Sequence, residues 1–130
     1  MSTATAYTHI RFDTVEDDAA KHGFGEQGSA RFATSDLAAE RTGVSLQRLN
    51  PGRRQSFGHR HDEAEEVYVV LSGSGRVKLD DEIVELRARD AIRVAPPVTR
   101  CFEAGEEGLE FLAVGARHAG DGELVPGWWS

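Results

Sequence analysis

The sequence predicts an all-β domain, and three features support this prediction. From Val44 onward, apolar and polar residues alternate in short runs, the pattern of strands with one buried face. Residues that favour turns separate these runs, among them Asn50-Pro51-Gly52 and Pro96-Pro97. A chain of 130 residues is long enough to bury about two-thirds of its unfolded surface around one core. We therefore expect a sandwich or barrel with low helix content.

The predicted strands lie between residues 44 and 114, and the segment before them is less regular. The strands are expected at 44–49, 55–59, 66–71, 75–79, 83–86, 91–94, 100–102 and 109–114. In the first 43 residues, 8–12 is expected as an edge strand and 23–28 as a loop. Residues 35–40 begin with capping residues and continue with good helix formers, so they predict at most one short helix.

Composition excludes several classes of partner and location. The chain has 15 Lys and Arg against 22 Asp and Glu, a formal net charge of −7, which repels phosphate backbones and anionic lipids. We therefore expect neither nucleic acid nor membrane as a partner. The single cysteine, Cys101, cannot form an internal disulfide, and residues 1–8 lack the features of a signal peptide. We expect a cytoplasmic protein.

The candidate chemistry lies in His59, His61 and Glu66. Residues two apart in a strand point to the same face, so the two imidazoles project together if that strand end is extended. In residues 66–71, alternation places Glu66, Tyr68 and Val70 on one face. Two imidazoles and a carboxylate form the 2-His-1-carboxylate ligand set, which suits Fe and is compatible with Mn, Ni, Co or Zn. The alternative interpretation is that both histidines are ordinary polar residues at a strand end.

A sequence motif strengthens the metal interpretation. Gly52 is followed by six residues, His59-Arg60-His61, four residues, Glu66, six residues and Gly73. This spacing resembles the first motif of the cupin superfamily, of the small single-domain "cupin 2" type, although the family has five residues before its first histidine. Glu65 is a second choice for the carboxylate, but the distance to Gly73 favours Glu66.

The resemblance implies a fold, a division of the chain and an assembly. It implies a double-stranded β-helix, the jelly-roll barrel of cupins, with two antiparallel sheets and the site in the barrel mouth. The barrel is expected over 44–115, with an N-terminal arm over 1–43 that packs on the barrel or on a dimer partner. Residues 116–130, which include Trp128 and Trp129, are expected to dock on the barrel as a tail. Cupins of this type commonly form homodimers.

The second cupin motif matches poorly, and Arg100 is its most informative departure. Arg100 stands where the family's last metal-binding histidine is expected, and a guanidinium offers only hydrogen-bond donors. Either His59, His61 and Glu66 hold the metal alone, or the metal is lost and Glu66 pairs with Arg100. In a third arrangement, Arg100 binds the carboxylate or phosphate of a ligand.

Three functions are compatible with these residues. The first is a metal-dependent enzyme on a small anionic molecule, with Tyr68 and Arg100 as candidate catalytic residues and Arg100, Tyr68 and Phe102 as candidate substrate-binding residues. The second is a non-catalytic ligand-binding or sensor cupin. The third is a metal-free isomerase or epimerase, with His59 or His61 as base and Tyr68 as acid.

Overall fold

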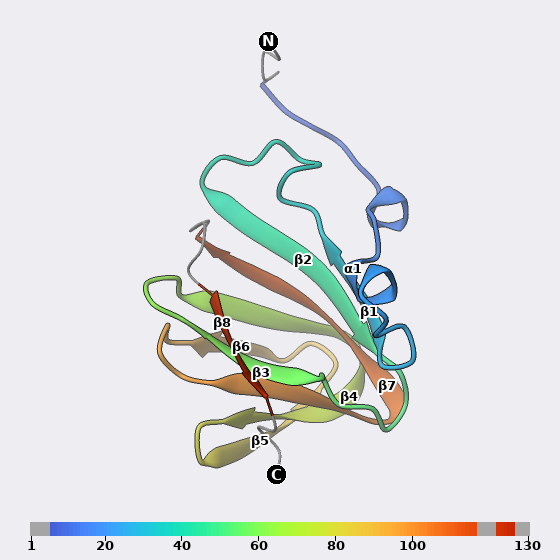
Figure 1. Cartoon of the computed structure of the whole chain (residues 1–130), viewed down its shortest axis with the longest axis vertical. Helices are drawn as coiled ribbons and strands as arrows, with labels where there is room; N and C mark the ends of the chain where they lie inside the picture. Colours follow the sequence, from blue (N-terminus) through green and yellow to red (C-terminus); the bar gives the residue numbers. More distant parts are fainter. Residues whose placement is uncertain (1–5, 117–121, 127–130) are drawn as a thin grey trace.

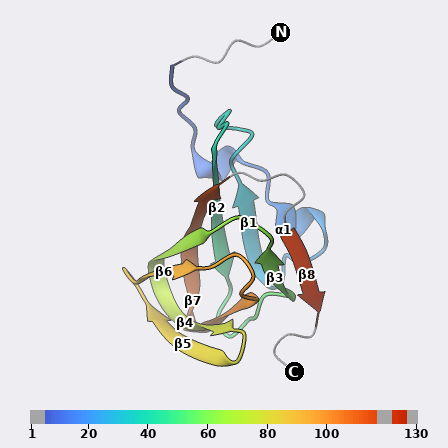
Figure 2. The ribbon, with the colours of Figure 1, turned by 90° about the vertical axis from the view of Figure 1, so that its left-hand side faces the viewer.

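Two antiparallel sheets that share their longest strands enclose the interior of the protein. The computed structural model describes residues 6–116 and 122–126. Strands β4 (Glu66–Leu79) and β7 (Arg100–Ala116) are the longest, and each has different neighbours along its two halves. They therefore pass from one sheet into the other. Figures 1 and 2 show the strands curling around a common interior.

The order of strands in each sheet follows from the pairings. The first sheet contains β1 (Gly28–Phe32), β2 (Thr42–Leu49), the second half of β7, the first half of β4, and β6 (Ala91–Val94). The second sheet contains β8 (Gly122–Pro126), β3 (Phe57–His61), the first half of β7, the second half of β4, and β5 (Glu82–Arg87). All of these pairings are antiparallel, so the predicted all-β fold with the double-stranded β-helix arrangement is confirmed.

The crossing between the sheets depends on two glycines that face each other. The register of β4 against β7 shifts between Val70 and Ser72 and again between Gly73 and Gly75. Gly73 and Gly108 both have a positive φ, of 78° and 82°, which side chains disfavour. A Cβ at Gly73 would also lie 2.0 Å from the carbonyl oxygen of Gly108. Gly73 of the sequence motif thus permits the close approach of the two long strands where they change sheet.

One half of the interior is filled with large side chains. Phe102 stacks on Phe111, with ring centroids 4.3 Å apart, and Tyr68 lies 4.8 Å from Phe102. All three are almost fully buried. The aliphatic residues around them are Leu49, Val70, Val77, Leu86, Val94 and Leu109. This packed half extends mainly over β4, β5 and β7.

The N-terminal segment corrects two predictions. Residues 8–12 do not form an edge strand: residues 6–9 are exposed, so this segment has no buried face to pair with a sheet, and a 3-10 turn, η1, spans Phe12–Thr14. The helix predicted at 35–40 is absent as well, because Ala38 adopts a positive φ of 55° and closes the segment into turns. The helix of the described chain is α1 (Asp18–Lys21), whose N-terminus the Asp17 carboxylate caps.

Most predicted strands are present with shifted ends. Residues 66–71 and 75–79 join into β4, and 100–102 and 109–114 join into β7, because bulges bend these strands without ending them. Strand β8 lies in the segment expected as a tail and pairs with β3. Trp128 and Trp129 lie outside the described residues. Within the described ranges, no helix is long and apolar enough to cross a membrane.

Candidate metal centre

Strand β3 brings His59 and His61 to the same side of the barrel wall. They alternate with Gly58 and with the exposed Arg60, so both imidazoles point into the interior. Their rings lie edge to face, with centroids 5.3 Å apart. Strand β3 is therefore extended as far as His61, as the predicted pairing of the two imidazoles requires.

Glu66, the first residue of β4, faces both histidines. Its Oε1 lies 3.1 Å from Nε2 of His61 and 3.3 Å from Nε2 of His59. The Tyr68 hydroxyl donates a hydrogen bond of 2.6 Å to the same oxygen. Three side chains from two strands thus converge on one carboxylate oxygen. Glu65 instead pairs with Arg93 at the surface, so Glu66 is the acid of the two that faces the histidines.

The surroundings of Glu66 keep it ionised. Burial alone raises the pKa of this carboxyl, but hydrogen bonds from His59 and Tyr68 and the charges of the two imidazoles outweigh burial and lower it to about 2. Burial and the adjacent Glu66 carboxylate raise the pKa of Tyr68 well above 10.0. Near neutral pH the site therefore presents a carboxylate together with a protonated phenol.

The donor set fits a divalent cation. Single ligand atoms of His59, His61 and Glu66 all lie within 4.8 Å of one another. Ligands about 2.1 Å from one ion, in adjacent coordination positions, lie about 3 Å apart. The distances of 3.1 Å and 3.3 Å from Oε1 to the two Nε2 atoms match this separation. A small outward shift of the three side chains would seat an ion, and the set would suit Fe, Mn, Ni, Co or Zn.

Arg100 lies beneath this cluster and is held by backbone groups. It faces His59 in the pairing of β3 with β7 and is fully buried. Its Nη1 donates to the carbonyl oxygen of Pro96 at 3.3 Å and its Nη2 to that of Ala95 at 3.5 Å. Nη2 lies 3.9 Å from Oε1 of Glu66, so it is farther from this oxygen than the two imidazoles and the Tyr68 hydroxyl are. Arg100 thus contributes a buried positive charge next to the carboxylate.

Tyr68 and Phe102 lie on the packed side of the cluster. Both are at most 1% exposed, and neither they nor Arg100 line the adjacent cavity. The substrate-binding role of these three residues and the catalytic role of Tyr68 and Arg100 stay predictions. In this structure the Tyr68 hydroxyl donates a hydrogen bond to Oε1 of Glu66, 2.6 Å away.

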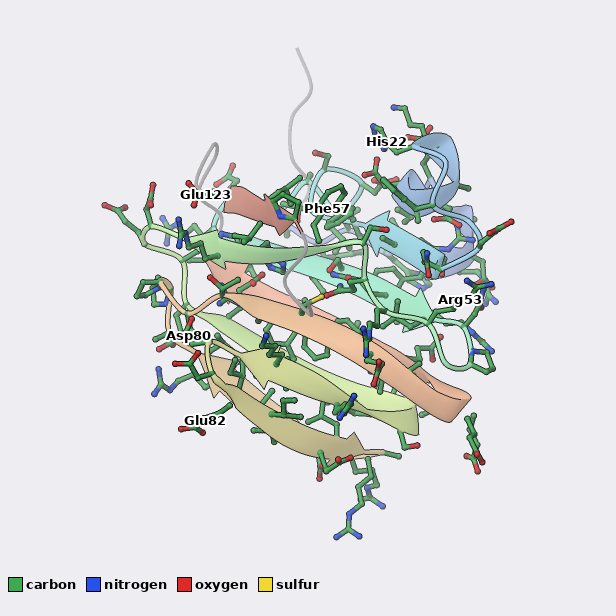
Figure 3. All side chains as sticks on the ribbon, turned by 60° about the horizontal axis from the view of Figure 1, so that its bottom comes forward. His22, Arg53, Phe57, Asp80, Glu82 and Glu123 are labelled. Atoms are coloured by element: carbon green, nitrogen blue, oxygen red, sulfur yellow. The ribbon has the colours of Figure 1, made fainter. Side chains whose placement is uncertain are left out.

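A cavity of about 890 Å³ opens on the other side of the cluster. His59, His61 and Glu66 form part of its wall, and the rest comes from β1, β2, β8 and the segment around α1. Figure 3 shows His22, Phe57 and Glu123, which all line this cavity, at the upper end of the molecule, and Glu82 at the lower end. The triad therefore lies between the packed half of the barrel and an open one.

Sequence reasoning missed several residues of the cavity wall. Apolar side chains gather at its mouth: Phe24 and Phe57 meet edge to face at 5.9 Å, and Phe32 and Leu124 are 53% and 66% exposed. Polar residues of the wall include Ser45, Gln47 and Gln55. Alternation along residues 44–49 places Ser45 and Gln47 on the face of the buried Leu49, which was the available signal.

Comparisons with known proteins agree with the architecture. The family model described as "Cupin domain" matches residues 45–115. A cupin protein from Bacteroides fragilis is 25% identical, with a TM-score of 0.71, covering 90% of this chain and 89% of that one. The polyketide cyclase RemF from Streptomyces resistomycificus is 20% identical, with a TM-score of 0.74 and coverage of 91% and 84%.

A larger enzyme contains a similar domain. Oxalate decarboxylase from Bacillus subtilis is 23% identical, with a TM-score of 0.74; the match covers 95% of this chain but 33% of that protein. No curated protein matches the chain. The matching family model, the shared double-stranded β-helix and the motif residues gathered at one site together show that this chain belongs to the cupin superfamily.

Proposed function

We propose that this cupin binds a divalent metal ion through His59, His61 and Glu66 and uses it to bind and transform a small organic molecule in the cavity. The observation that carries the proposal is the position of the three ligand atoms, which face one another at the inner end of the cavity. A metal bound there would supply Lewis-acid or redox chemistry at its open coordination positions. Among the similar structures, the oxalate decarboxylase and the polyketide cyclase are enzymes that act on small organic molecules, which supports this class of function.

The residues around the triad have distinct tasks in this proposal. The Tyr68 hydroxyl donates to Glu66 and so restricts the orientation of the carboxylate. Arg100 places a buried positive charge 3.9 Å from that carboxylate, and this charge opposes the cation that the triad would hold. The packed residues below them exclude water from one side of the triad, so that a ligand approaches from the cavity alone.

A metal-binding measurement with matched variants tests the proposal. The purified protein is dialysed against zinc or manganese, and bound metal is measured by mass spectrometry. We expect about one equivalent in the wild type and in His9→Ala, which removes an exposed histidine outside the triad. His61→Ala and Glu66→Gln should lose at least about tenfold in affinity with the fold retained in circular dichroism. Equal metal content in all four proteins would refute the proposal.

A metal-free isomerase or epimerase and a non-catalytic sensor are the competing functions. The first requires Tyr68 to reach a substrate, whereas Tyr68 is 1% exposed and its hydroxyl is engaged by Glu66. Turnover of small molecules by the metal-loaded protein, absent after chelation and absent in Glu66→Gln, would support the enzyme. Ligand binding without turnover would support the sensor, and turnover that survives chelation would support the isomerase.

A further inference from the structure

Next to the triad, the floor of the cavity carries little side-chain volume. The residues that the first sheet contributes there are Gly43, Ser45, Ala113 and Gly115, and larger residues of this sheet that line the cavity, such as Phe32, Gln47 and Leu49, belong to β1 and to the rest of β2. A Cβ at Gly115 would lie 2.6 Å from the carbonyl oxygen of Glu65, so this position cannot accept a side chain. At Gly43 the atoms nearest to such a Cβ lie 3.6 Å away, an ordinary contact distance, so this position can accept a side chain. The glycine at 43 thus leaves room beside the triad that a larger residue would occupy.

The opposite wall is built from larger side chains. Phe57, His59 and Leu124 belong to β3 and β8 of the second sheet and line the cavity. Sheets that pack face to face lie about 10 Å apart. Beside the triad, the first sheet contributes glycine, serine and alanine and the second contributes rings, so the remaining space there is wide and flat. The exposed apolar groups of Phe32 and Leu124 at its mouth would be covered by an apolar ligand.

A directed chain of hydrogen bonds ends at Ser45. The backbone N–H of Phe102 donates to Oε1 of Gln55 at 3.0 Å, which fixes the orientation of this amide. Nε2 of Gln55 then donates to Oε1 of Gln47 at 3.0 Å, and Nε2 of Gln47 donates to Oγ of Ser45 at 3.1 Å. Ser45 is 4% exposed, and its hydroxyl makes no other hydrogen bond within the described residues. Its hydroxyl hydrogen therefore remains available to an acceptor in the cavity.

The position of Ser45 sets the size of such a ligand. Ser45 pairs with Ala113, and Glu66 pairs with Gly115 on the same strand β7, so β7 separates Ser45 from Glu66. Two strand spacings separate their backbones by roughly 10 Å. A molecule that reaches both Ser45 and the metal site must therefore span more than one ring.

The charges of the wall disfavour an anionic ligand, since Asp18, Glu66 and Glu123 line the cavity. Arg48 is the one Lys or Arg lining the cavity within residues 6–116 and 122–126, and it is exposed. It is an odd number of residues from Ser45 in β2, so its side chain projects from the opposite face. The donor that faces the flat space is thus a neutral hydroxyl.

We propose that the cavity binds a planar, uncharged compound of two or more fused rings, whose carbonyl oxygen accepts a hydrogen bond from Ser45 while an oxygen at its other end reaches the metal. This rests on the metal site proposed above. It makes Ser45 a specificity-determining residue, with Gln47 and Gln55 as the positioning residues that direct its hydroxyl. It also differs from the small anion that the sequence predicted.

Two bicyclic probes test the proposal in the zinc-loaded protein. 5-Hydroxy-1-tetralone carries a phenol at one end and a ketone at the other, and 5,6,7,8-tetrahydro-1-naphthol lacks the ketone. Binding is measured by calorimetry and ligand-observed NMR. We expect the ketone to bind about tenfold more tightly to the wild type, and Ser45→Ala to remove this preference. Ser72→Ala, at an exposed position of β4 outside the cavity, should retain it.

Further arms separate this proposal from the metal proposal. Gly43→Leu, which fills the flat space, should weaken both probes about tenfold. Zinc affinity should stay unchanged in Ser45→Ala and Gly43→Leu. A wild type that does not bind zinc would instead count against the metal site itself. The proposal is overturned if the wild type binds zinc but binds both probes equally or neither, if Ser45→Ala keeps the preference, or if oxalate or benzoate binds more tightly than the ketone.

Discussion

The two halves of the barrel interior differ in the size of the side chains that their strands contribute. Around Tyr68, Phe102 and Phe111, aromatic and branched side chains fill the space between the sheets. Around Ser45 and Gly115, the same first sheet contributes small residues, and a cavity of about 890 Å³ remains. The triad lies at the boundary between the halves. The difference indicates that stability comes mainly from one half, whereas the other half is open.

Removing a phenyl ring should cost far more stability in the packed half than on the cavity side. Phe111→Ala removes a ring that is 0% exposed and stacked on Phe102, and it should lower the free energy of unfolding by about 4 kcal/mol. Phe32→Ala removes the same group from the cavity side, where Phe32 is 53% exposed, and should cost less than about 1 kcal/mol. Urea denaturation measures the free energy of unfolding of both variants. Equal losses in the two variants would show that the halves do not differ in their contribution to stability.

The second prediction concerns pH at the boundary. The pKa of Glu66 is about 2 in the folded protein and near 4.5 in the unfolded chain, so its carboxylate stabilises the fold fully above about pH 4.5. That stabilisation, on the order of 3 kcal/mol, is lost as pH falls through the folded pKa. Glu66→Gln lacks this contribution. The free energies of unfolding of the metal-free wild type and of metal-free Glu66→Gln should therefore approach each other as pH falls from 5 to about 2. A constant difference between the two over this pH range would show that the partners of Glu66 do not stabilise its carboxylate.

The third prediction uses the buried charge of Arg100. Its guanidinium lies next to the carboxylate that would bind the cation, so it weakens metal binding by repulsion. Arg100→Met keeps a long side chain without the charge and should tighten zinc binding about tenfold, and Arg100→His should tighten it further by adding a ligand. Calorimetry at low salt measures the change, and melting temperatures control for loss of the bonds to the carbonyl groups of Ala95 and Pro96. Equal zinc affinity in all three proteins would remove Arg100 from the account of the site.

The barrel could be predicted because its strands have one buried and one exposed face, which alternation reveals. Strand β6 occupies the predicted 91–94, and β2 and β5 differ from prediction only at their ends. The triad could be predicted because its members lie close in sequence on two neighbouring strands. His59 and His61 share a face by period alone, and the spacing to Gly73 distinguished Glu66 from Glu65.

The cavity wall could not be predicted, since it depends on segments that meet only in the folded chain. Phe24 and Phe57 come from the N-terminal segment and from β3, and Leu124 comes from β8, which pairs with β3 through five residues rich in turn formers. The wrong helix at 35–40 has a similar cause, because the conformation of Ala38 is set by the turn that leads into β2. The homodimer and the anionic ligand stay predictions.

Anomalous diffraction from crystals soaked with zinc locates the bound ion. We expect a single strong peak about 2.1 Å from Nε2 of His59, Nε2 of His61 and the Glu66 carboxylate, with the open coordination positions of the ion toward the cavity. The same crystals of Glu66→Gln should show the peak reduced or absent. A peak at the acidic turn formed by Asp80, Asp81 and Glu82, with none at the triad, would show that the triad is not the metal site.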